Sequence, residues 1–192
     1  MTDTQNGAKK LTRGCTLCPV KCGAARSVTV GACGAGDDVK IAKFYLHKGE
    51  EPIISGTNGS GAVFFCGCSL KCAFCQNYEL SRALRGKVFT INELAAIFKK
   101  LENDGAHNIN LVTATQYADK IIAALKKSGL TVPVVYNTHG YERVETLKML
   151  NDFISVYLPD LKFYSNTVSE RYTGKKDYFA VASRAIEYMS EK

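Results

Sequence analysis

Short apolar runs alternate with amphipathic segments along most of the chain. The runs contain no charged residue and occupy residues 62–65, 109–114, 132–136 and 153–159. Continuous apolar runs of this length are typical of strands that are buried on both faces of a parallel sheet. The pattern therefore predicts four parallel strands.

Helix signals lie between these runs and after the last one. The clearest begins at Thr90, where TINE has the Thr-x-x-Glu form of a capping box, and apolar residues then recur at helical spacing up to Gly105. The same pattern recurs with shorter apolar faces over residues 118–128, 142–150 and 178–189. Strand followed by helix, four times, predicts a parallel α/β sheet with its reactive groups at the carboxyl ends of the strands.

Composition divides the chain into three parts. Residues 1–14 are polar and are predicted to form a disordered tail. Residues 15–61 form a Cys-rich N-terminal lobe and a turn-rich lead-in loop, EEPIISGTNGSG, and residues 62–192 form the core. A chain of 192 residues has material for one compact core and too little length for two full domains.

Composition and charge also exclude several functional classes. No window approaches the ~18 apolar residues of a membrane span, and the N-terminus lacks the apolar stretch of a signal peptide. We therefore expect a cytoplasmic protein with no membrane partner. The net charge is +7, but the lysine doublets are spread over separate segments, which favours a solvated surface over nucleic-acid binding. Eight cysteines without an export signal indicate metal binding rather than disulfides.

The first predicted strand runs into GCSLKCAFCQN, which places Cys68, Cys72 and Cys75 in Cys-x3-Cys-x2-Cys spacing on one loop. Three thiolates can each bind one iron of a cubane 4Fe-4S cluster and leave the fourth iron open to a ligand. The alternative is a structural zinc site or three unrelated core cysteines, but zinc prefers four protein ligands. Cys66, on the incoming strand, is left out of the ligand set.

A second group of cysteines precedes the core. Cys15, Cys18, Cys22 and Cys33 supply four thiolates, which suits either tetrahedral zinc or a fully ligated auxiliary iron-sulfur cluster. The spacing does not decide between the two metals. Free thiols are the remaining alternative.

The loop GCSLKCAFCQN resembles the Cys-x3-Cys-x-aromatic-Cys signature of the radical SAM superfamily, with Phe74 as the aromatic residue. The resemblance implies that the open iron binds S-adenosylmethionine. An electron from a donor such as flavodoxin or ferredoxin then cleaves it to methionine and a 5'-deoxyadenosyl radical, which abstracts a hydrogen atom. Further similarity covers residues 15–192, in EEPIISGTNGSG, FCQNYELS, INLVT, VVYNTHGYE and YLPDLK. These stretches resemble the PflX-like branch of pyruvate formate-lyase activating enzyme homologues, which implies glycyl-radical activation as the nearest analogy.

The same resemblance implies cofactor contacts at the strand ends. NTHGY, residues 137–141, is similar to an Asp-Thr-Asn-Gly-Phe stretch, and DLK, residues 160–162, to an Asp-Leu-Lys motif. Thr113-Ala114-Thr115-Gln116 stands where most members have a Gly-Gly-Glu type motif, and its side chains can still form hydrogen bonds. The expected cofactor-binding residues are Thr113, Thr115, Asn137, Thr138, Asp160 and Lys162.

Alternatives remain for several of these positions. Asp160 and Lys162 can instead form a solvated ion pair at a strand end, and Asn137 can be a turn residue. His139 is interpreted as a solvated turn residue, with proton relay as the alternative.

Complete barrels of the branch resemble six strand-helix units, whereas four precede Lys192. We therefore expect a partial (β/α) barrel with an apolar edge strand, which binds a cluster but holds S-adenosylmethionine poorly. The substrate is a protein or a small molecule. Two rival hypotheses are a radical SAM modifier of an unrelated substrate and a non-catalytic iron-sulfur or zinc-binding relative.

Overall fold

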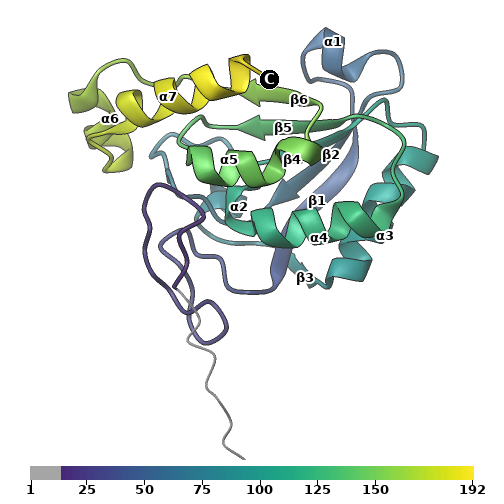
Figure 1. Ribbon diagram of the computed structural model, residues 1–192, viewed down its shortest axis with the longest axis horizontal. Helices are drawn as coiled ribbons and strands as arrows, with labels where there is room; N and C mark the ends of the chain where they lie inside the picture. Colours follow the sequence, from purple (N-terminus) through teal and green to yellow (C-terminus); the bar gives the residue numbers. More distant parts are fainter. Residues whose placement is uncertain (1–13) are drawn as a thin grey trace, which may run out of the picture.

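The computed structural model describes residues 14–192, and Figure 1 shows their arrangement. A six-stranded sheet has the order β3-β1-β2-β4-β5-β6. Its strands are β1 (Val39–His47), β2 (Ser60–Phe65), β3 (Lys87–Phe89), β4 (Ile109–Val112), β5 (Val134–Thr138) and β6 (Val156–Pro159). The predicted tail lies outside the described residues, except for Gly14.

The helices follow the strands along the chain. They are α1 (Pro52–Ser55), α2 (Tyr78–Ser81), α3 (Ile91–Asn103), α4 (Ala118–Ser128), α5 (Val144–Leu150), α6 (Asn166–Thr173) and α7 (Tyr178–Ser190). Short 3-10 turns cover Thr115–Tyr117 and Asn151–Phe153. Within residues 14–192, no helix is long and apolar enough to cross a membrane.

The four predicted parallel strands are present and adjacent. β2 pairs with β4, β4 with β5, and β5 with β6, all in parallel. The register aligns Phe64 with Val112, Val112 with Asn137, and Asn137 with Leu158, so these four side chains form one row across the sheet. The expected α/β architecture, consistent with a partial radical SAM barrel, is confirmed.

Two antiparallel strands extend the sheet beyond the predicted four. β1 pairs with both β2 and β3 in antiparallel orientation. Its sequence, VKIAKFYLH, places the lysines on the more exposed face and buries Val39 and Ile41. The sheet therefore extends into the segment that the sequence assigned to the N-terminal lobe and its lead-in loop.

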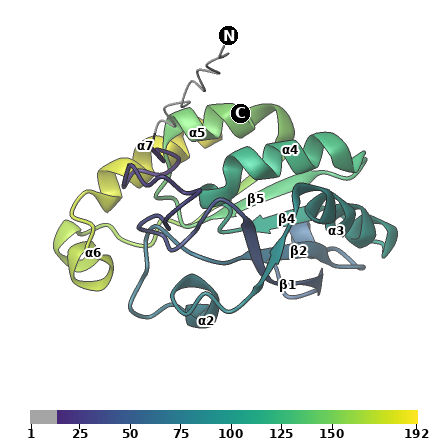
Figure 2. The same ribbon diagram turned by 90° about the horizontal axis from the view of Figure 1, so that it is seen from below.

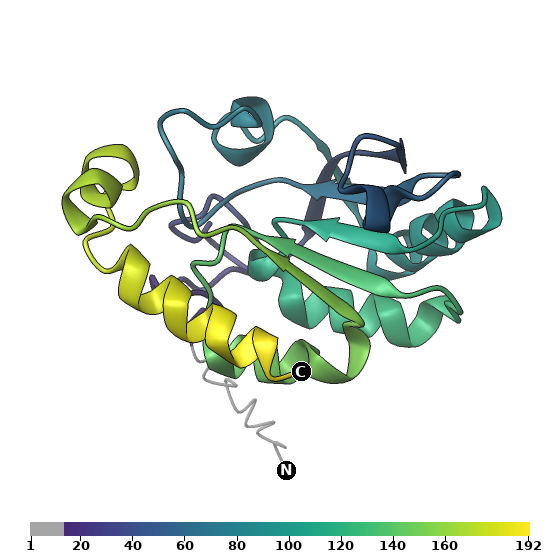
Figure 3. The same ribbon diagram turned by 90° about the horizontal axis from the view of Figure 1, so that it is seen from above.

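One face of the sheet is covered by α3, α4, α5 and α7, whereas α2 lies on the other side (Figures 2 and 3). The core between sheet and helices contains Phe98 of α3, Ile121 of α4 and Leu147 of α5. The capping box of α3 is confirmed, because the Thr90 N–H donates to Glu93 Oε2 at 2.7 Å and the Glu93 N–H donates to Thr90 Oγ1. This packed layer holds the strand ends, which leaves their loops available for chemistry.

The N-terminal lobe has no helix or strand between residues 14 and 38. It packs on the start of α5, where the Thr146 hydroxyl donates to the Leu17 carbonyl at 2.6 Å. It also contacts the 3-10 turn after β4, where the Arg26 guanidinium donates to the Gln116 carbonyl and lies over the Tyr117 ring. The lobe is therefore attached both to a helix that covers the sheet and to the end of β4.

Candidate active site

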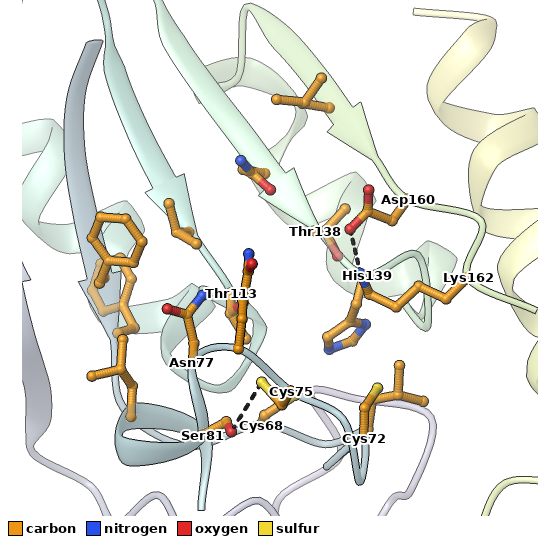
Figure 4. A pocket seen from close by; sticks show the side chains of 18 of the residues that line it. Cys68, Cys72, Cys75, Asn77, Ser81, Thr113, Thr138, His139, Asp160 and Lys162 are labelled. Carbon is orange, nitrogen blue, oxygen red and sulfur yellow. Dashed lines mark hydrogen bonds and ion pairs between the residues drawn. The ribbon is translucent and has the colours of Figure 1, made fainter. Parts of the chain in front are cut away.

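A cavity of about 590 Å³ lies beside the carboxyl ends of the parallel strands (Figure 4). Residues from the loop after β2 and from the ends of β4, β5 and β6 line it together. Those from the predicted set are Cys68, Cys72, Cys75, Thr113, Asn137, Thr138, Asp160 and Lys162. The structure thus collects the three motif cysteines and five of the six expected cofactor residues around one space.

The loop after β2 is held in place by its backbone. Gly67 has a φ of +89°, and a Cβ at that position would lie 2.8 Å from the Cys33 carbonyl oxygen, so the turn requires glycine. The Cys68 N–H donates to the same carbonyl at 3.1 Å. From the other side, Gln116 Nε2 donates to the carbonyls of Cys66 and Gly67 at 3.1 and 3.0 Å. The loop is therefore fixed before it reaches its second cysteine.

The three loop thiols lie in a setting that favours metal over free thiolate. Burial raises the pKa of Cys68, and burial together with the neighbouring Cys68 raises the pKa of Cys72 to about 11. The backbone N–H groups of Lys71 and Leu70 face the Cys68 sulfur, and the Ser81 hydroxyl donates to Cys75 Sγ at 3.4 Å. Because buried thiolates need positive charge nearby, an iron centre would stabilise the ionised forms.

The aromatic residue of the motif attaches the loop to α6. Phe74 is 58% exposed, and its ring meets Phe163 and Tyr172 edge to face at centroid distances of 5.8 and 5.7 Å. The neighbouring Ala73 N–H donates to the Tyr172 carbonyl at 2.8 Å. The loop is thus supported by a helix that the sequence patterns did not predict.

Asp160 and Lys162 form an ion pair at the end of β6, with 2.6 Å between Oδ2 and Nζ (Figure 4). Their side chains are 59% and 30% exposed, so the pair is of the solvated kind considered as the alternative, although both residues line the cavity. The Tyr178 hydroxyl accepts from the Lys162 N–H at 2.8 Å and lies 2.8 Å from the His139 carbonyl. A buried tyrosine from α7 therefore fixes the ends of β5 and β6 relative to each other.

Thr115 differs from the other expected cofactor residues, because it does not line the cavity. It is buried, its hydroxyl donates to Glu142 Oε1, and it accepts from the Tyr136 hydroxyl at 3.2 Å. With these bonds its hydroxyl is not available to a ligand. The expectation for Thr115 is therefore not supported by the geometry, and the residue acts as a partner of Glu142.

Two groups near the cavity are buried, which the sequence did not predict. His139, expected to be solvated, is 6% exposed and lines the cavity, and burial lowers its pKa. Its Nδ1 accepts from the Tyr141 N–H at 3.1 Å, so the neutral ring carries its proton on Nε2, which lies 3.4 Å from the Ser69 hydroxyl. This corrects the interpretation of His139, because its burial depends on α7 and the loop after β2.

Glu142 is the second such group. Its side chain is buried, which raises the pKa of the carboxyl. Oε1 accepts from the Thr115 and Thr138 hydroxyls, whereas Oε2 has no hydrogen-bond partner within residues 14–192. The sequence offered no signal for it beyond its position at the start of an expected helix.

The N-terminal cysteines are neighbours pair by pair, because Cys18 lies near Cys15 and Cys33, and Cys33 lies near Cys22. A Cβ at Gly31 would lie 3.4 Å from the sulfurs of both Cys22 and Cys33. Burial raises the pKa of Cys18 to about 11 and also raises that of Cys33. For Cys22, burial also acts to raise the pKa, but the N–H groups of Ala32, Ala24 and Cys22 itself, together with the charge of Arg26, outweigh it and lower the pKa.

Backbone N–H groups face these sulfurs in a regular way. The N–H two residues further on faces the sulfur of Cys18, Cys22 and Cys33, from Val20, Ala24 and Ala35 respectively. Such donors favour the thiolate form that binds metals. None of the eight cysteines is in a disulfide.

Comparison with known proteins identifies the family. The sequence model of the Radical SAM superfamily matches residues 62–192. The chain belongs to the radical SAM superfamily. It is also 32% identical over 186 residues to an uncharacterised protein from Methanocaldococcus jannaschii, in an alignment that covers 92% of this chain and 54% of the relative. The chain thus spans about half the length of the curated relative that it matches.

The superfamily implies a 4Fe-4S cluster and S-adenosylmethionine, and the residues of this radical SAM chain fit both. Within residues 14–192, no three or more His, Cys, Asp or Glu side chains are placed to hold a single metal ion. A cubane cluster requires a different geometry, because each thiolate binds its own iron and the sulfurs remain apart. Three thiols on one loop beside an open cavity fit this geometry. The N-terminal group has the four ligands of a closed site but not its converged geometry.

Proposed function

We propose that the chain is a radical SAM enzyme that resembles the activating enzymes of glycyl-radical enzymes, with its cluster on Cys68, Cys72 and Cys75. One observation carries this proposal: the cluster loop shares a single cavity with Asn137, Thr138 and the Asp160–Lys162 pair. These segments lie far apart in sequence and each resembles a stretch of the activating enzymes. Their convergence supports a common cofactor site.

The chain's own residues would position and shield the cofactor. Thr113 offers a hydroxyl group after β4, and Asn137 offers the groups of its amide that do not bind Glu50. Lys162, which is paired with Asp160, offers its remaining N–H donors to a carboxylate. The apolar side chains of Phe64, Val112 and Leu158 line the same cavity and exclude water. When bound, the cluster and S-adenosylmethionine supply a 5'-deoxyadenosyl radical that abstracts a hydrogen atom.

We further propose that Cys15, Cys18, Cys22 and Cys33 bind a second metal centre, either zinc or an auxiliary iron-sulfur cluster. Its role would be structural, because four thiolates leave no open position. The Cys33 carbonyl accepts from the Cys68 N–H at 3.1 Å and lies against Gly67, so the lobe supports the cluster loop directly. The lobe would then hold the first cluster ligand in place.

The remaining proposals concern partners and location. The proposed enzyme receives electrons from a carrier such as flavodoxin or ferredoxin and acts on a protein or a small molecule. Its eight free thiols suit the reducing conditions of the cytoplasm. The domain division proposed is a Cys-rich lobe and lead-in before residue 62 and a radical SAM core from there on, with β1 contributed to the sheet by the first part.

The decisive experiment is anaerobic reconstitution of the full chain followed by reduction with dithionite in the presence of S-adenosylmethionine. We expect an oxygen-sensitive 4Fe-4S cluster, a change in its electron paramagnetic resonance signal on adding the cofactor, and formation of 5'-deoxyadenosine. A cluster whose signal changes without formation of 5'-deoxyadenosine would instead identify a non-catalytic relative. Absence of a loop-bound cluster would contradict the proposal altogether.

A further inference from the structure

The segment EEPIISGTNGSG places a carboxylate in the cavity that the proposed cofactor chemistry does not use. Glu50 lines the cavity from the connection between β1 and α1. Its Oε2 accepts from Asn110 Nδ2 at 3.0 Å and from Asn137 Nδ2 at 3.1 Å. Two amides from adjacent strands thus hold one oxygen of the carboxylate, and no protein donor contacts Oε1 within residues 14–192.

The two asparagines are unusual residues for their positions. On β4, β5 and β6, the other positions on the same face of the sheet are apolar, namely Val112, Val135, Val156 and Leu158. Asn110 is fully buried on β4, and its Oδ1 has no hydrogen-bond partner among the described residues. Because burial of an amide is costly unless its groups are bonded, both asparagines are best explained as orienting Glu50.

The charge of Glu50 is not balanced by the protein. In the part of the chain that the structure describes, Glu50 takes part in no ion pair, and Lys162 is already paired with Asp160. A carboxylate that lines a partly enclosed cavity and receives only neutral donors attracts a cation, since a charge-assisted hydrogen bond is stronger than a neutral one. The cavity therefore presents a prepared site for a cationic group.

Glu50 reaches the cavity from a different segment than the cluster loop. It contacts Asn110 in the first half of β4 and Asn137 near the end of β5, whereas Cys68 follows the end of β2. Figure 1 shows α1, which begins two residues after Glu50, at the end of the sheet away from α6. The amino and carboxylate groups of S-adenosylmethionine are expected at the cluster, so its ammonium group is not the cation that we assign to Glu50.

We propose that Glu50 is a recognition carboxylate and that the substrate carries an ammonium or guanidinium group, which binds Glu50 at Oε1. The inference rests on the proposed function, because the cavity is a substrate site only if the chain acts on a substrate there. Asn110 and Asn137 are positioning residues in this proposal. They keep Oε1 directed to the ligand by holding Oε2.

The test measures binding of n-butylammonium and of n-butanol to the reconstituted full chain by ligand-observed nuclear magnetic resonance, without S-adenosylmethionine. We expect the wild type to select n-butylammonium and Glu50→Gln to weaken its binding at least about tenfold, with n-butanol binding unchanged. The glutamine retains an oxygen that accepts from both asparagines, so the fold should persist. Glu50→Asp, which keeps the charge on a shorter side chain, should give a smaller loss.

Glu51→Gln is the matched control, because it removes the same charge at the next residue, whose side chain is exposed and lines the same cavity. We expect less than about a twofold change, as for screened surface charges. Equal losses in Glu50→Gln and Glu51→Gln would show that the cavity attracts cations through its overall negative charge and not through Glu50. That result would overturn the proposal. Competition between S-adenosylmethionine and n-butylammonium at Glu50 would also overturn it, because Glu50 would then be a cofactor contact.

Iron content and the response of the cluster signal to S-adenosylmethionine are measured on the same samples. A protein that holds the cluster and binds both probes alike overturns only the role of Glu50. A protein that selects n-butylammonium through Glu50 and has no loop cluster supports that role and contradicts the proposed function. The two claims therefore fail separately.

Discussion

The two cysteine groups share a pattern of backbone N–H groups near their sulfurs but have different surroundings. In both, backbone N–H groups shortly after a cysteine face its sulfur, as Val20 does for Cys18 and Leu70 for Cys68. The cluster loop has three cysteines, all of which line the cavity. The N-terminal lobe has four cysteines, and none of them lines it. We therefore propose an open, reactive centre in one place and a closed, stabilising centre in the other.

The two groups also meet. The Cys33 carbonyl accepts the Cys68 N–H, so one residue of each group is joined by a single hydrogen bond. Arg26 adds a second connection through the Gln116 carbonyl, and Gln116 in turn holds the cluster loop. Loss of the lobe should therefore affect the loop, whereas loss of the loop ligands should leave the lobe intact.

The largest expected effect is that of Cys72→Ala. Removal of one of three ligands should abolish the loop-bound cluster, its response to S-adenosylmethionine and formation of 5'-deoxyadenosine, because a cubane held by two thiolates is labile. Iron analysis and electron paramagnetic resonance measure the loss. Cys66→Ala is the matched control, since Cys66 is equally buried but does not line the cavity. Retention of the same signal in Cys72→Ala would refute the ligand assignment.

Cys18→Ser should have a smaller effect with a different character. It should remove the N-terminal metal and lower the melting temperature by about 5 °C or more, since the binding energy of a structural metal contributes to folding. The loop cluster should still form but be lost more rapidly. Metal analysis and thermal unfolding test this, again against Cys66→Ala. If the wild-type chain holds no zinc, and no iron other than that of the loop cluster, the proposed N-terminal metal centre is contradicted.

Local sequence signals predicted those parts of the fold that local interactions determine. The capping box at Thr90 marked the start of α3 correctly, and the helix predicted over residues 118–128 has the bounds of α4. β1 was missed because two lysines interrupt its apolar pattern, and α6 because a polar helix that begins after Ser165 gives little periodic signal. These elements form because they pair with or pack on other parts of the chain.

The candidate site was predictable to a similar degree. Spacing alone placed Cys68, Cys72 and Cys75 on one loop, and that loop lines the cavity. By contrast, His139 is distinguished by its burial, and Glu50 by hydrogen bonds from asparagines 60 and 87 residues away. No local pattern encodes either feature. Thr115 is the opposite case. The sequence predicted that its hydroxyl contacts the cofactor, but in the structure that hydroxyl donates to Glu142.

The smallest predicted effect concerns Glu142, which lies between the two regions and accepts from Thr115 and Thr138. Burial raises its pKa above the ordinary value, so the folded state holds its proton more tightly than the unfolded state does. At low pH both states are protonated and the group has no net effect. As the pH rises above the ordinary pKa of about 4.5, the unfolded state gains by ionisation and stability falls until the folded pKa is passed.

Glu142→Gln removes this pH-dependent loss and retains a carbonyl oxygen for the two threonines. The variant should therefore gain stability relative to wild type as the pH rises from 5 to 8, by an amount within the ~1–2 kcal/mol common for single substitutions. Melting temperatures of both proteins across this range measure the difference. Burial lowers the pKa of His139, and the nearby Glu142 carboxylate opposes this shift, so Glu142→Gln also changes the contribution of His139. That contribution acts mainly below pH 6.5, so the change between pH 6.5 and 8 reports on Glu142. A difference that does not vary with pH would mean that the Glu142 carboxyl titrates alike in the folded and unfolded states.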